Sequence, residues 1–172
     1  MRGPRQGRVG IAWGVRARPL HEPAIRAAVR AALLHGGRAG IDVEVALVSD
    51  RHLAGIHGRF LGDPAPTDVI SFDLGEDGDG PAAEIYVSVD RARAVARERG
   101  VEVEGELLLY LVHGALHLCG FDDRTAPQRT RMRAAEAAVL SDLGQPTSAR
   151  KRVRGGSRGP AVNRKTKKTS RA

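Results

Sequence analysis

The chain has 172 residues, a single cysteine and a formal net charge of +8 at pH 7. One cysteine excludes an intrachain disulfide framework and is typical of a reducing compartment. No stretch approaches the roughly 18 consecutive apolar residues that span a bilayer, and the basic N-terminal segment lacks the apolar region of a secretory signal. These features predict a cytoplasmic protein with no membrane partner.

The positive charge is concentrated at the C-terminal end. Residues 149–172 contain ten Lys or Arg and no Asp or Glu, which leaves a net charge of −2 for residues 1–148. The basic segment has no hydrophobic period, which predicts disorder. We therefore expect one globular domain over 1–148 and a disordered basic tail over 149–172. The charges between Arg150 and Arg171 would bind phosphate backbones without sequence preference; a solubilising tail with no dedicated partner is the alternative.

Hydrophobic periodicity divides the domain into strands and helices. The pattern predicts strands over 9–15, 42–48, 67–74 and 84–89. It predicts helices over 22–36, from 49–50 through 60, from 88–90 to 99, from 104–106 to 119, and from 125 to 143. Ser49 before a helix and a capping box at Thr125 and Gln128 support these starts. The order β-α-β-α-β-β-α-α-α predicts an α+β domain, with a small mixed β-sheet packed with helices.

The most informative stretch is 107–123, LLLYLVHGALHLCGFDD. Residues 107–118 are almost wholly apolar except for His113 and His117, which predicts a helix buried on all sides. Histidines four positions apart lie on one face of a helix. Gly120 can end the helix in the left-handed conformation. Asp123 then completes the spacing His, +4 His, +7 Gly and +10 ligand, which matches the metzincin motif and predicts a zincin-like metal helix.

Two histidines and a carboxylate with an open fourth position are more typical of a catalytic zinc-like centre than of a structural one. The alternative is that both histidines are hydrogen-bonded core residues. Gly114 stands at the position of the protease general base, which argues against a metalloprotease. We expect this glycine to leave room above the metal. Cys119, on the far side of the helix from His117, is expected to be a buried, unreactive thiol.

Three short segments carry a further signal. They are residues 66–72 (PTDVISF), 84–88 (EIYVS) and 113–123 (HGALHLCGFDD). In this order they resemble P-T-D-V-L-S-F, G-D-I-x-I-S and H-G-x-L-H-L-x-G-Y-D-H, the signature segments of the YbeY endoribonucleases. Met132 and Glu136 also stand where that family often has Met and Glu. The resemblance covers about residues 9–143.

The resemblance implies a single-strand-specific endoribonuclease in 16S rRNA 3′-end maturation and ribosome quality control, with rRNA and ribosomal subunits as partners. It implies one zinc ion per chain, held here by His113, His117 and Asp123. Water activated by the metal would attack the phosphodiester, because a bound metal acidifies water and polarises the phosphate. No side chain in the motif is an evident proton acceptor. A metal-stabilised ribosome- or RNA-binding module with little catalysis is the alternative.

The chain departs from the family pattern at two positions. Asp123 stands where the third ligand is usually His, and a carboxylate leaves less net positive charge on the metal. Leu61 stands where the family has an arginine, so Arg59 is the nearest candidate for a contact to RNA phosphate; a solvated surface arginine is the alternative. Thr67 and Ser71 lie on the strand expected to border the cleft and are candidate hydrogen-bonding partners of the RNA.

Overall fold

The computed structural model describes residues 5–62, 67–146 and 162–163. In chain order its elements are β1 (Val9–Trp13), α1 (Glu22–His35), β2 (Val43–Val48), α2 (Asp50–Leu61), β3 (Val69–Asp73), β4 (Ala83–Ser88), α3 (Val89–Arg99), α4 (Val103–Leu118), α5 (Ala126–Asp142) and β5 (Val162–Asn163). This order matches the predicted one, with the two-residue strand β5 added. The rest of the predicted tail, 149–172, lies outside the described residues.

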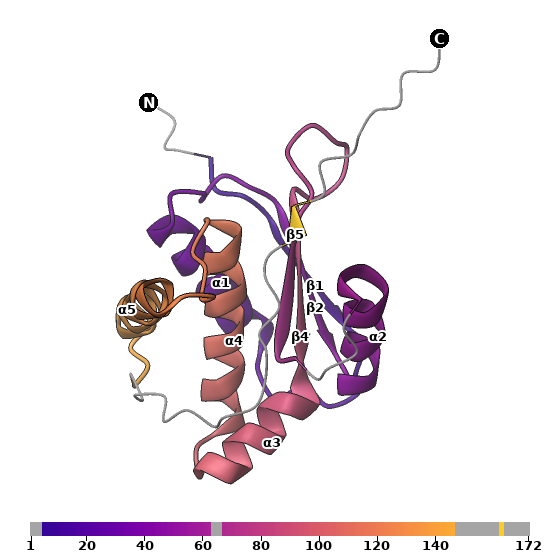
Figure 1. Ribbon diagram of the computed structural model, residues 1–172, viewed down its shortest axis with the longest axis vertical. Coiled ribbons are helices and arrows are strands. Elements are labelled where there is room, and N and C mark those ends of the chain that lie inside the picture. The colour runs from indigo at the N-terminus through magenta and orange to yellow at the C-terminus, as the bar shows by residue number, and fades with distance from the viewer. Residues whose placement is uncertain (1–4, 63–66, 147–161, 164–172) are drawn as a thin grey trace.

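The strands form one mixed sheet in the order β1-β2-β4-β3-β5. Strands β1, β2 and β4 are parallel, β3 is antiparallel to β4, and β5 pairs parallel with β3. Figure 1 shows α4 and α1 on one side of the sheet, α5 outside them, α2 on the other side and α3 at one end. The predicted α+β architecture is confirmed. None of the helices in the described ranges is long and apolar enough to cross a membrane.

Side-chain caps set several helix starts. Ser49 and Ser88 each accept a hydrogen bond from a backbone N–H in the first turn of the helix that follows. Thr125 Oγ1 accepts from the Gln128 N–H, and Gln128 Oε1 accepts from the Thr125 N–H, so the predicted capping box is present. These contacts satisfy amide groups that have no partner within a helix.

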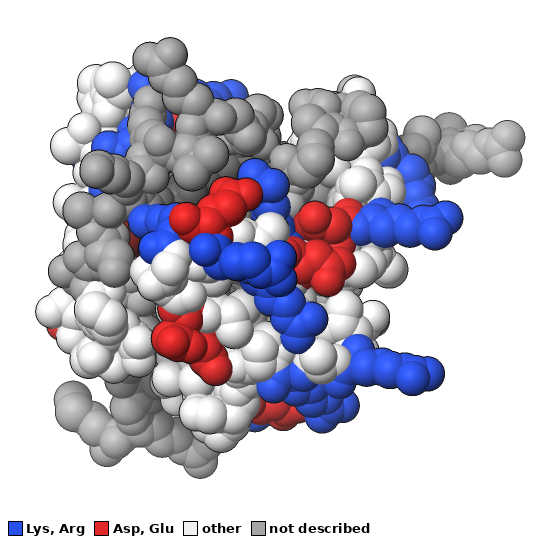
Figure 2. All heavy atoms as spheres, turned by 90° about the horizontal axis from the view of Figure 1, so that it is seen from below, with Lys and Arg blue, Asp and Glu red and all other residues white. Residues whose placement is uncertain are grey.

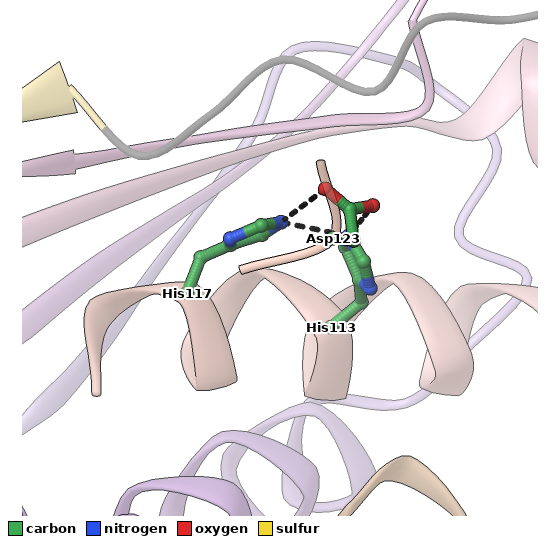
Figure 3. A group of neighbouring side chains, drawn as sticks. All are labelled: His113, His117 and Asp123. Atoms are coloured by element: carbon green, nitrogen blue, oxygen red, sulfur yellow. Dashed lines mark hydrogen bonds and ion pairs between the residues drawn. The ribbon is translucent and has the colours of Figure 1, made fainter. Parts of the chain in front are cut away.

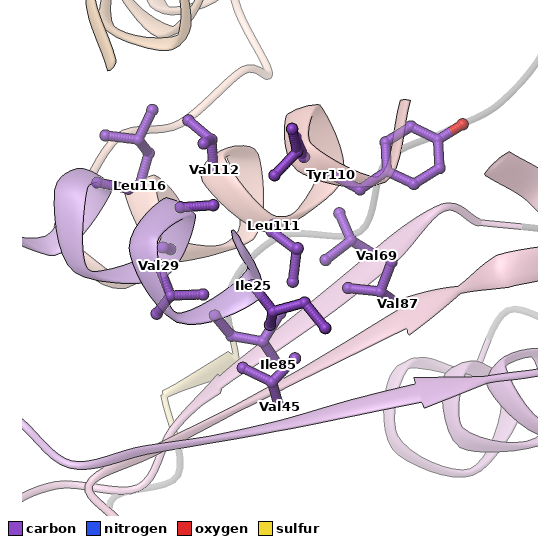
Figure 4. Packing of buried hydrophobic residues seen from close by; sticks show 14 of the residues in the cluster. Ile25, Val29, Val45, Val69, Ile85, Val87, Tyr110, Leu111, Val112 and Leu116 are labelled. Atoms are coloured by element: carbon purple, nitrogen blue, oxygen red, sulfur yellow. The ribbon is translucent and has the colours of Figure 1, made fainter. Parts of the chain in front are cut away.

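Helix α4 lies at the centre of the main hydrophobic core. It contacts α1, α3, α5, β3 and β4, and residues 106–118 are all buried. Figure 4 shows Leu111 of α4 packed near Ile25 of α1 and Ile85 of β4. Neighbours on every side explain why this helix has no polar face, and they confirm the predicted buried helix.

Strand β3 divides its side chains between two cores. Val69 belongs to the main core beneath α4. Ile70 and Phe72 pack instead with Leu53 of α2, in a smaller cluster on the other face of the sheet, with Leu74 partly buried against it. Ile70, Phe72 and Leu74 therefore share the face of the sheet that α2 covers, as the alternation of side chains along a strand requires.

Gly114 allows α4 to approach the sheet closely. A Cβ atom at this position would lie 2.8 Å from Val69 Cγ2 and 3.0 Å from both Ile85 Cγ2 and Ser71 Oγ. The buried Ser71 hydroxyl donates to the Gly114 carbonyl oxygen at 2.8 Å. The expectation that Gly114 leaves room above a metal is wrong, because this position faces β3 and β4. Its lack of a side chain serves packing between helix and sheet.

Candidate metal centre

Three side chains converge near the C-terminal end of α4. His113 and His117 project from one face of the helix, and Asp123 reaches them from the loop that follows (Figure 3). The two Nε2 atoms are 2.9 Å apart. Asp123 places one carboxylate oxygen 3.6 Å from His113 Nε2 and the other 3.9 Å from His117 Nε2. The structure thus brings together the three residues that the spacing predicted as ligands.

Each imidazole is oriented through its other nitrogen. His113 Nδ1 lies 2.6 Å from Oε1 of Glu136 in α5, and His117 Nδ1 lies 2.9 Å from the carbonyl oxygen of Phe121. A carbonyl is only an acceptor and an ionised carboxylate is too, so both rings carry their proton on Nδ1. The two Nε2 lone pairs then point toward each other beside a carboxylate. This arrangement is repulsive on its own and fits a cation bound between the three groups.

The donor set is one that zinc uses in catalytic sites. Zn²⁺ binds imidazole nitrogen and carboxylate oxygen at about 2.0–2.2 Å in a tetrahedral arrangement, so its ligand atoms lie about 3.4 Å from one another. The observed separations of 2.9, 3.6 and 3.9 Å are distributed around that value. The His113 side chain is fully buried, whereas the Asp123 side chain is 13% exposed. Solvent therefore reaches the group from the Asp123 side.

The loop that carries Asp123 is held on both sides of this residue. Gly120 has a φ of +89°, in the left-handed region predicted for the helix stop. The Asp123 N–H donates to Oδ1 of Asp122 at 2.8 Å, and Nη1 of Arg129 donates to the Asp123 carbonyl oxygen at 3.3 Å. These backbone contacts limit the positions that the third candidate ligand can take.

Arg38 fastens the C-terminal end of α4 to the sheet. Its Nη1 donates at 2.7 Å to the Leu118 carbonyl oxygen and at 2.7 Å to Oδ2 of Asp73 in β3. The last carbonyl groups of a helix have no partners within it and carry partial negative charge, so the guanidinium satisfies one of them and offsets that charge. Arg38 therefore fixes the turn of α4 that contains His117.

The structure gives the three predicted RNA-contacting residues different environments. Arg59 is exposed in the last turn of α2, a helix on the side of the sheet opposite α4 (Figure 1). Thr67 is buried before β3, and its Oγ1 has no hydrogen-bond partner among the described residues, which exclude 63–66. Ser71 is buried against α4, and its hydroxyl is used within the protein. The side chain of Leu61 lies outside the described residues. RNA contacts by Arg59 and Thr67 stay predictions.

Spacing along the chain did not identify Glu136 as part of this site. The residue lies 23 positions after His113, on a different helix, so no helical period connects the two. Its only signal in the sequence is its place in the family resemblance. Glu136 is 4% exposed, and a carboxylate this buried requires a partner. His113 Nδ1 is such a partner.

Cys119 packs against α1. Its sulfur lies 4.0 Å from the Ala32 carbonyl oxygen, and burial raises the pKa of its thiol to about 11. The thiol is therefore protonated at neutral pH, and a thiol is a much weaker nucleophile than a thiolate. This supports the prediction of an unreactive cysteine.

The fold and the site together define a zincin-like domain: a buried helix with two histidines one turn apart, and a third candidate ligand from the turn that follows. The family model for endoribonuclease YbeY matches residues 18–144. The chain belongs to the YbeY endoribonuclease family, as its signature segments predicted.

Individual relatives agree with this assignment. Endoribonuclease YbeY of Bacillus pumilus is 36% identical over 115 residues, which cover 60% of this chain and 72% of that protein. The Bacillus licheniformis protein of the same name is 35% identical over 125 residues, covering 66% and 79%. The solution structure of TM1509 from Thermotoga maritima is 26% identical, with a TM-score of 0.53, and the match covers 83% of this chain and 97% of that one.

Proposed function

We propose that this protein is a metal-dependent, single-strand-specific endoribonuclease that acts in 16S rRNA 3′-end maturation and ribosome quality control. One observation carries the proposal: two imidazole lone pairs and one carboxylate converge on a single point in a chain of the YbeY family. The substrate would be rRNA within or released from ribosomal subunits, in the cytoplasm. The resemblance of the three signature segments supports this substrate class.

The residues of the site have separate tasks in this proposal. His113, His117 and Asp123 would hold one zinc ion, which acidifies a water molecule and polarises a phosphate oxygen when bound. Glu136 keeps His113 in the tautomer that presents Nε2, and the Phe121 carbonyl does the same for His117. The Asp123 carboxylate makes the centre less electropositive than a third imidazole would.

A peptidase of similar metal spacing is not favoured. Its general base would stand at Gly114, where even a Cβ atom would meet Val69 Cγ2 at 2.8 Å. A glutamate side chain built there would be directed into the sheet and away from the metal ligands. The position that serves as the base in metzincins is therefore closed to that role in this fold.

The test uses a labelled precursor fragment containing the 3′ end of 16S rRNA. Purified protein and a His117→Ala variant are each incubated with it, with chelator, and with chelator followed by zinc. We expect the wild type to cleave, the chelator to abolish cleavage, zinc to restore it, and the variant to be inactive. His117→Ala removes a candidate metal ligand and no Lys or Arg side chain, so the variant should still bind RNA.

Two results would contradict the proposal. Equal cleavage by the variant would identify a contaminating nuclease. Metal and RNA binding by the wild type without cleavage, under conditions in which a control ribonuclease cuts the fragment, would instead support a metal-stabilised RNA-binding module.

A further inference from the structure

One side of helix α5 faces the metal centre. Helical spacing places Arg129, Arg133 and Glu136 together, because positions three and four apart are neighbours on a helix surface. Glu136 Oε1 lies 2.6 Å from His113 Nδ1, and Arg129 Nη1 donates to the Asp123 carbonyl oxygen at 3.3 Å. Both ends of this row therefore contact residues of the site, and Arg133 lies between them.

Neither arginine on this side of α5 forms an ion pair with a residue in the described ranges, although Glu136 lies in the same row. The Arg129 guanidinium donates to the carbonyl oxygens of Asp123 and Arg124, the latter at 2.7 Å; these acceptors carry no net charge. Arg133 is exposed and forms no ion pair with any residue in the described ranges. Like charges one turn apart repel each other. A bound anion would relieve this repulsion, and guanidinium groups bind phosphate through paired N–H donors.

Another group of Lys and Arg side chains lies at the opposite end of α4, near α3. It differs from the Arg129–Arg133 side of α5 in two respects. Figure 2 views the end of the molecule where α3 lies, and there the Lys and Arg side chains are interspersed with Asp and Glu. Asp90 and Glu98 stand among the arginines of α3, and Arg99 pairs with the buried Glu106 at 2.7 Å. Charges of both signs largely cancel at a distance, and this end holds none of the candidate metal ligands.

We infer that the Arg129–Arg133 side of α5 binds the backbone of the RNA strand at a phosphate next to the one that undergoes cleavage. The inference rests on the proposed function and deepens it by naming where the strand is held. Arg133 contacts the phosphate, while Arg129 fixes the Asp123 loop and adds its charge. A phosphate contact positions a strand without reading its bases, so Arg133 sets the alignment of the strand with the metal centre and not the sequence preference.

Arg131 supplies a matched control on the same helix. It lies two positions before Arg133, which is about 200° around a helix of 3.6 residues per turn. Its side chain lines a hollow of about 280 Å³, together with Phe121, Asp122 and Gln128. Arg131 is also exposed, so replacing either arginine removes one exposed positive charge from α5. Only Arg133 lies on the side that faces the metal centre.

The experiment compares zinc-loaded wild type, Arg133→Gln and Arg131→Gln. Binding of a fluorescent single-stranded fragment of the 16S rRNA 3′ end is followed by anisotropy on ice at several salt concentrations, and a gel confirms that the RNA stays intact. We expect Arg133→Gln to weaken binding about tenfold and to lower the slope of log Kd against log salt by about 0.7. Arg131→Gln should match the wild type, and thermal unfolding should be the same for all three proteins.

Each outcome bears on the inference separately from the catalytic proposal. Equal losses in both variants would show a general effect of charge and overturn the inference, as would wild-type binding by Arg133→Gln. Binding that requires Arg133 in a protein that never cleaves would uphold the phosphate contact on α5 and overturn the proposed catalysis. Failure of the wild type to bind RNA would overturn both.

Discussion

Glu136 is not itself a candidate metal ligand, but its Oε1 lies 2.6 Å from His113 Nδ1. Among the residues that are not candidate ligands, it is therefore the one on which metal binding should depend most. Glu136→Ala removes the acceptor that keeps the imidazole proton on Nδ1. We expect zinc affinity to fall about 10- to 100-fold, measured by competition with a colorimetric chelator. Glu98→Ala, an exposed change on α3, should leave affinity unchanged. Equal affinity in the two variants would mean that Glu136 does not orient His113.

Tyr86 provides a test of electrostatics away from the metal centre. Burial, followed by the hydrogen bond and negative charge of Glu84, raises the pKa of its phenol from 10.0 to about 12. The raised pKa favours the protonated form in the fold, so this stabilisation is complete below pH 10 and is lost as the pH rises through about 12.

Glu84→Gln should lower the Tyr86 pKa, because it removes the negative charge, while burial keeps the pKa above its ordinary value. The measurement is the phenolate absorbance during an alkaline titration. A Tyr86→Phe variant identifies which transition belongs to this residue. An unchanged transition in Glu84→Gln would contradict the assigned cause.

At the scale of secondary structure, Gly114 and Gly105 form an internal comparison within α4. A Cβ atom at Gly114 would meet Val69, Ile85 and Ser71 at 2.8–3.0 Å, whereas one at Gly105 would meet nothing within 4 Å. Gly105→Ala should stabilise the protein by up to about 1 kcal/mol, through helix propensity. Gly114→Ala makes the same propensity gain, but overpacking costs about 1–3 kcal/mol, so we expect net destabilisation.

Urea unfolding of both alanine variants measures this difference. The control for packing is Ser71→Ala in the Gly114→Ala background, which removes one of the three crowded atoms along with the hydrogen bond to the Gly114 carbonyl. Equal stabilisation by both glycine substitutions would show that α4 moves away from the sheet at little cost.

Several features of the elements follow from local sequence. Ser49 and Thr125 cap helices where the pattern placed them, and Ser88 caps α3 at the first position of the predicted 88–90 start, because capping joins groups only two or three residues apart. Gly120 stops α4 for an equally local reason. The face that α4 turns toward the sheet could not be predicted, since a helix buried on all sides has no polar side to orient it. That is why the expectation for Gly114 was wrong.

At the scale of the whole molecule, the basic C-terminal segment can be tested without removing β5. Truncation after Asn163 deletes Arg164, Lys165, Lys167, Lys168 and Arg171 and retains the strand. We expect a weaker salt dependence of RNA binding, with the slope of log Kd against log salt lowered by up to about 3.5 if all five charges contact phosphates. The cleavage position should not change, because such contacts do not select sequence.

Replacing the same five residues by Gln in the full-length chain separates charge from length. Both variants should lose the same part of the slope. A slope equal to that of the wild type would exclude these residues as an electrostatic contributor to RNA binding.

Short-range patterns in the sequence were enough to predict the order of the elements, the buried character of α4 and the grouping of His113, His117 and Asp123. These features depend on helical periodicity and on a turn of a few residues, which act over short stretches of chain. The folded structure was needed to show that Glu136 orients His113, that Arg129 holds the Asp123 loop and that Arg38 anchors α4. Each of these contacts joins separate elements, and their packing is set by the whole core rather than by any local pattern.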